Sequence, residues 1–75
     1  MFEVSIFDPE RRLFEKSVSQ VRLPGEGGEF AVEDFHVSMI SLLKAGRIYV
    51  DGKHLPIRKG IAVVDRNKLL VLVER

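Results

Sequence analysis

Two histidines are the side chains of this chain best suited to acid–base or metal chemistry. Catalysis would need a nucleophile with a base, a pair of carboxylates, or metal ligands at a usable spacing. His36 and His54 lie far apart in a sequence that contains no cysteine. Two imidazoles alone still need further ligands and groups that orient them. A structural or surface role is favoured for both histidines, so we expect no catalytic residue, no metal site and no cofactor.

A glycine-rich segment could be compared with a loop that binds phosphate. Residues 24–28 read Pro-Gly-Glu-Gly-Gly. A phosphate-binding loop continues into Lys followed by Ser or Thr and opens onto a helix N-terminus, and neither feature is present here. Because glycine permits positive φ angles that other residues avoid, the segment predicts a tight, exposed turn that needs no ligand.

Two basic doublets could contact phosphate groups. Arg11-Arg12 lies beside acidic neighbours, whereas Arg58-Lys59 has none adjacent, and no aromatic stacking platform is evident. Twelve Lys and Arg against 11 Asp and Glu leave a formal charge of +1, without the basic stripe of a dedicated nucleic-acid binder. A solvated surface is favoured, and we expect no nucleic-acid partner. A free-standing small β-barrel that binds nucleic acid remains the alternative function, which a salt titration of binding would test.

Phe35 is a large apolar residue between acidic residues and a histidine in a predicted loop. Such a residue either folds back into the core or is offered to a partner. A core position is favoured when Phe35 is considered alone. His36, Val37 and Met39 could, however, complete a binding patch around Phe35. Both interpretations stay open at this stage.

The elements that would position these residues are short strands. Apolar and polar residues alternate over residues 2–7, and Asp8-Pro9-Glu10 then predicts a turn into a strand near 13–18. A strand up to Leu23 follows. Residues 29–32 and, more weakly, 37–43 are interpreted as further strands.

The second half of the chain contains two hairpin signals. Asp51-Gly52 suits a two-residue type I′ turn, and Pro56 would place the returning strand at a sheet edge. Residues 61–64 and 69–73 are apolar runs that we expect to be buried on both faces, joined by a turn in which Asn67 can take a left-handed conformation. Phe30 and Leu72 are both expected in the core.

The pattern predicts one all-β domain over residues 1–75, a small β-sandwich of short, mostly antiparallel strands. The start of the chain has neither the basic nor the apolar region of a signal peptide, and no apolar run is long enough to cross a membrane. We therefore expect an unprocessed cytoplasmic protein.

The order of motifs resembles the epsilon subunit of F-type ATP synthases. That family reads Leu-Pro-Gly, two variable positions, Gly-Glu-Phe-Gly-Val, then a histidine, and later Leu-Lys-Pro-Gly. This chain has LPGEGGEFAV over residues 23–32, His36, and Leu-Lys-Ala-Gly over residues 43–46. The tail from Gly60 to Leu72 is similar to the closing strands of the family, so the resemblance spans nearly the whole chain. Glu33-Asp34-Phe35 and Val37-Ser38 depart from the family pattern around the histidine.

The resemblance implies a non-catalytic subunit of the central stalk, in which this sandwich couples the gamma subunit to the membrane c-ring. The C-terminal helical hairpin of the family is absent from these residues, so its inhibitory role and nucleotide site are not carried over. The implied location is the cytoplasmic face of the cell membrane, reached peripherally through the complex. The implied gamma interface comprises Asp8, His36, Val37, Ser38, Met39, Ser41 and Leu42. The implied c-ring interface comprises Glu26, Gly27, Gly28 and Glu29.

Overall fold

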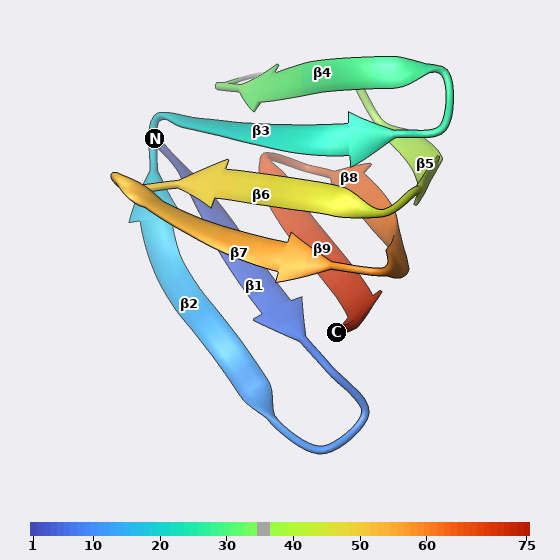
Figure 1. The fold of residues 1–75 in the computed structure, drawn as a ribbon. Coiled ribbons are helices and arrows are strands. Elements are labelled where there is room, and N and C mark those ends of the chain that lie inside the picture. The colour runs from blue at the N-terminus through green and yellow to red at the C-terminus, as the bar shows by residue number, and fades with distance from the viewer. Residues whose placement is uncertain (35–36) are drawn as a thin grey trace.

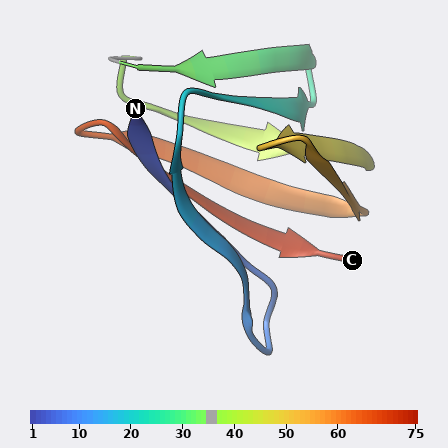
Figure 2. The same ribbon diagram turned by 90° about the vertical axis from the view of Figure 1, so that its left-hand side faces the viewer.

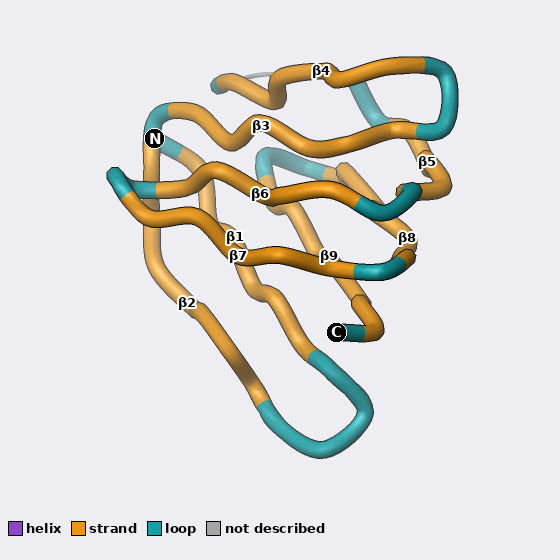
Figure 3. Tube along the Cα trace, in the orientation of Figure 1, coloured by secondary structure: helices purple, strands orange, loops and turns teal. Residues whose placement is uncertain are grey.

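A computed structural model describes residues 1–34 and 37–75, and within these ranges the chain forms strands and no helix (Figures 1 and 3). No helix in the described ranges is therefore long and apolar enough to cross a membrane. The predicted all-β class is confirmed. The strands are β1 (Phe2–Phe7), β2 (Arg12–Val18), β3 (Gln20–Gly25), β4 (Gly28–Glu33), β5 (Met39–Leu43), β6 (Gly46–Val50), β7 (Lys53–Ile57), β8 (Lys59–Asp65) and β9 (Lys68–Glu74).

The strands form one sheet that curls into two layers. The order is β2-β1-β9-β8-β5-β3-β6-β7, with β4 added beside β3. One layer contains β2, β1, β9, β8 and β5, and the other contains β4, β3, β6 and β7 (Figure 1). A short β3–β5 pairing, whose only register pair is Gly25 with Leu43, joins the layers. Every described pairing is antiparallel except that of β1 with β9, which confirms the predicted sandwich of mostly antiparallel strands.

The predicted turns form for the expected backbone reasons. Asp51 and Gly52 have φ angles of 51° and 74°, which close the β6–β7 hairpin. Asn67 takes φ 61° between β8 and β9, as the left-handed preference of asparagine predicts. Asp8 accepts hydrogen bonds through Oδ1 from two backbone N–H groups of its own turn, and the β1–β2 hairpin extends away from the body (Figure 2). Pro56 lies in β7, at the predicted edge.

The core lies between the two layers and is entirely apolar among the described residues. Strand β1 buries Phe2, Val4 and Ile6, and the facing strand β3 buries Val21 and Leu23. These residues alternate along their strands because successive side chains of a strand point to opposite faces of the sheet. The fold therefore depends on one apolar face from each layer.

Two expectations about the core need correction. Leu72 is 46% exposed, although it was predicted to be buried. The run that contains it alternates strictly along β9, so Leu69 is buried while Leu70 points outward, and the expectation of burial on both faces is wrong. The cause is that β9 lies between β1 and β8 in one layer, and none of the described strands covers its outer face. Phe30 is half-buried and packs against the core, as predicted in part.

The glycine-rich segment is less exposed than predicted. Pro24 and Gly25 are buried within β3, and only the turn that follows is solvent-accessible. Gly28 has a φ angle of 131°, which favours glycine, whereas Gly27 does not have a positive φ. Gly25 is required for another reason, because a Cβ atom there would lie 2.8 Å from the ring of Phe30.

Candidate interaction surfaces

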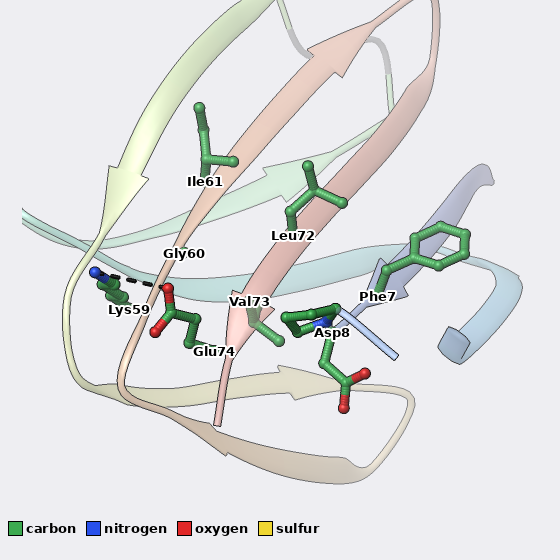
Figure 4. Close-up of a pocket in the computed structure, with 9 residues that line it drawn as sticks. Phe7, Asp8, Lys59, Gly60, Ile61, Leu72, Val73 and Glu74 are labelled. Atoms are coloured by element: carbon green, nitrogen blue, oxygen red, sulfur yellow. Dashed lines mark ion pairs between the residues drawn. The ribbon is translucent and has the colours of Figure 1, made fainter. Parts of the chain in front are cut away.

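One outer surface of the sandwich is apolar and uncovered, and we call it the apolar face. Its residues form two rows across β1, β9, β8 and β5, because the strand register aligns them. Figure 4 shows three residues of one row on neighbouring strands. The first row consists of Phe7, Leu72, Ile61 and Leu42. The second row consists of Leu70, Val63 and Ile40.

The apolar face is exposed to a degree that indicates a partner. Ile40 is 70% exposed and Leu42 is 55% exposed. Single exposed apolar residues are ordinary on soluble proteins, whereas a contiguous group of them marks an interaction site. The two rows make such a group, because each residue is the register partner of the next. The apolar face is therefore a candidate interaction surface.

A shallow depression lies at one end of the apolar face. Its volume is about 430 Å³, and apolar side chains such as Phe7 and Leu72 line most of it. Charged side chains stand at its margin, where Lys59 Nζ lies 3.6 Å from Glu74 Oε2 (Figure 4). The depression can accept an apolar side chain whose neighbours carry polar or charged groups.

Asp8 forms another part of this margin. Its Oδ1 accepts the N–H of Glu10 at 2.8 Å and that of Arg11 at 2.9 Å, and its Oδ2 lies 3.6 Å from the Arg75 guanidinium. The hydrogen bond from Glu10, reinforced by that from Arg11 and by the nearby arginine charges, lowers the pKa of Asp8 below its ordinary value. Asp8 is therefore a fixed negative charge beside the apolar depression at neutral pH.

A second exposed feature is the turn between β3 and β4, which we call the acidic turn (residues 26–29). Glu26 and Glu29 are both exposed, and Glu29 forms an ion pair with Arg22. Glu26 forms no ion pair with any other described residue. The turn thus presents a net negative, solvated surface, with two glycines that leave room for close approach.

The residues expected at a gamma interface lie in different environments. Leu42 belongs to the apolar face, and Ser38 donates from Oγ to Asp65 Oδ1 over 3.3 Å at the polar end of the same layer. Met39 and Ser41 pair with buried residues of β8 and point towards the core side. Val37 is exposed just before β5, and His36 lies outside the described residues. Asp8 is at the far end of the layer, beyond Phe7.

Most of the apolar face was missed by sequence analysis. Leu70 and Leu72 belong to an unbroken apolar run, which cannot reveal that one of its faces is uncovered. Ile40 lies between two residues that were singled out, but the pattern of Ile40, Ser41 and Leu42 would place the two apolar side chains inside, whereas Ser41 is the residue that points towards the core side. Phe7 directly follows Ile6 and so breaks the alternation of β1, which places Phe7 on the face opposite the buried residues.

Several groups that were considered for metal or nucleic-acid binding contact other side chains in the described residues. The structure contains no group of three or more His, Cys, Asp or Glu residues there that could hold a metal ion. Each basic doublet has a member paired with a carboxylate, since Arg12 lies 2.9 Å from Glu15 and Lys59 Nζ lies 3.6 Å from Glu74. The guanidinium of Arg22 covers the ring of Tyr49, with 5.6 Å to its centroid, so this ring is not a free stacking platform.

These features are typical of a small β-sandwich domain that assembles with other proteins. The chain matches, over residues 1–75, the family model described as ATP synthase, Delta/Epsilon chain, beta-sandwich domain. The chain belongs to this family. A relative named ATP synthase epsilon chain, from Campylobacter concisus (strain 13826), is 41% identical over 76 residues, covering 95% of this chain and 59% of the relative. The chain thus spans less than two thirds of the length of that relative.

Solved structures share the fold. A chain in the central stalk and c-ring of the Tetrahymena thermophila mitochondrial ATP synthase superposes with a TM-score of 0.86 at 12% identity, covering 97% of this chain and 63% of that one. A chain of the Euglena gracilis mitochondrial ATP synthase gives a TM-score of 0.85 at 18% identity, covering 96% and 49%. At these identities the likeness concerns the fold alone.

Proposed function

We propose that the chain is a non-catalytic part of the central stalk of an F-type ATP synthase. In this proposal it holds the gamma subunit through the apolar face and approaches the c-ring through the acidic turn. The gamma subunit and the c-ring therefore rotate together during ion-driven ATP synthesis. Association with the membrane is peripheral, through the complex, at its cytoplasmic face.

The observation that carries the proposal is the apolar face beside a separate acidic turn. A permanent protein interface requires an apolar centre with a polar margin, which the seven residues of the face and the charged groups near Asp8 supply. The acidic turn suits a wetter and weaker contact, because its carboxylates are exposed. Membership of the family named for ATP synthase delta and epsilon chains supports this division of roles.

The gamma contact is tested by placing a polar side chain in the apolar face. Leu72→Ser should abolish co-purification of the gamma subunit, because truncation of a central interface residue costs about 2 kcal/mol or more, some 30-fold in affinity. Tyr49→Ser is the matched control, since Tyr49 is exposed to a similar degree but lies on the other layer. Equal gamma binding by both variants and the unchanged chain would refute the assignment.

The c-ring contact is tested by reversing charge at the acidic turn. Glu26→Lys should reduce retention of the subunit on membranes that contain the c-ring, and more at low salt than at high salt. Gamma binding should stay unchanged, because residue 26 lies outside the apolar face. Wild-type retention across the salt range would show that this turn does not contact the ring.

A further inference from the structure

The two proposed interfaces are joined by a short backbone connection. The N–H of Glu26 donates to the carbonyl of Leu42 over 3.0 Å, and the N–H of Lys44 donates to the carbonyl of Pro24 over 2.8 Å. These bonds flank the Gly25–Leu43 pair that joins the layers. Leu42 presents its side chain to the apolar face while its carbonyl holds the first residue of the acidic turn. The two surfaces therefore adjoin at this backbone connection.

At two glycines of this connection an added Cβ atom would lie too close to neighbouring atoms. A Cβ atom on Gly25 would lie 2.8 Å from the carbonyl oxygen of Gly28 and from the ring of Phe30. A Cβ atom on Gly46 would lie 2.7 Å from Cβ of Pro24. Pro24 has no flexible side-chain end that could turn aside, because its ring is bonded to its own backbone and the residue is buried within β3. A methyl group on residue 46 would therefore have to shift the β3 backbone. The end of β3 is held between β4 and the start of β6.

We propose that Pro24, Gly25 and Gly46 are positioning residues that fix the direction of the acidic turn relative to the apolar face. This inference rests on the proposed function, because a subunit that couples gamma to the c-ring must keep a fixed angle between its two contact surfaces. The glycines are required for close approach and not for a positive φ, which neither has.

The placement of the acidic turn relative to the first layer can be followed as a distance between two spin labels in the 75-residue chain. The sequence contains no cysteine, so spin labels at Glu26→Cys and Lys68→Cys report a single distance by pulsed electron paramagnetic resonance. Gly46→Ala should shift or broaden that distance, because the added methyl group displaces Pro24. Gly27→Ala is the matched control and should leave that distance unchanged, since no described atom lies within 4 Å of its Cβ position and its φ is not positive.

Two further measurements separate a positioning role from general destabilisation. Pro24→Gly in the Gly46→Ala background removes the atom that the new methyl group meets, so the original distance should return. In the assembled complex Gly46→Ala should keep gamma and lose c-ring retention, whereas a purely structural defect would lower both together with the melting temperature. An unchanged distance in Gly46→Ala, or one that the double variant fails to restore, would overturn the inference whether or not gamma binding is observed.

Discussion

Truncation of a buried leucine, Leu23, and of an exposed one, Leu72, tests whether the outer face of β9 is a free surface that a partner can bind. Leu23 is 0% exposed, so Leu23→Ala loses the whole side-chain burial and opens a cavity, at a cost of about 2–5 kcal/mol. The entire free energy of unfolding of a 75-residue domain is roughly 4–11 kcal/mol. Leu72 is 46% exposed and its loss creates no closed cavity, so Leu72→Ala should cost about 1 kcal/mol or less.

Thermal denaturation followed by circular dichroism gives the comparison. A domain of this size loses about 4–8 °C of melting temperature per kcal/mol, so the Leu23 variant should melt at least about 8 °C lower. The Leu72 variant should melt within several degrees of the unchanged chain and yet bind the gamma subunit poorly. If Leu72→Ala destabilised the chain as much as Leu23→Ala, the side chain would belong to a packed core and the apolar face would not be a free surface.

Two other predictions follow from the backbone and from charge. Gly28→Ala should destabilise the chain by about 1 kcal/mol or more, because its φ of 131° suits glycine, while Gly27→Ala should be neutral in the same thermal denaturation. The lowered pKa of Asp8 stabilises the fold above about pH 4, where the unfolded carboxyl is ionised, and this contribution is lost as the pH falls through the folded value. Asp8→Asn should therefore show a smaller loss of melting temperature between pH 5 and pH 2 than the unchanged chain, and an equal loss would contradict the assignment.

The turns could be predicted from the sequence because each depends on a local backbone preference. Asp51-Gly52 and Asn67 adopt the left-handed angles that their types favour, and Asp8 caps its own turn. The alternation in Phe2–Phe7 likewise identified the core side of β1, since a polar residue separates each buried pair. These features need no knowledge of distant contacts.

The apolar face could not be predicted in the same way. Which side of Leu69–Val73 is buried depends on the parallel pairing of β1 with β9, and those strands lie at opposite ends of the sequence. A run of five apolar residues has no alternation of apolar and polar positions, so it does not show which side chains are buried and which are exposed. The acidic turn was located correctly, but its buried anchor at Pro24 depends on contact with Gly46, twenty-two positions away.

The outer surface of the layer formed by β2, β1, β9, β8 and β5 changes in polarity along its strands. This change distinguishes residues that the fold requires from residues that are available for binding. At one end the register aligns Glu3, Lys68 and Asp65, which are charged and exposed. At the other end it aligns Leu72 and Ile61 with the rest of the first apolar row. All these positions occupy the same outer surface of the same strands, so a sheet that tolerates charge at one end does not need apolar residues at the other in order to fold. The apolar row is therefore best explained by a partner that covers this end of the layer, beside the acidic turn.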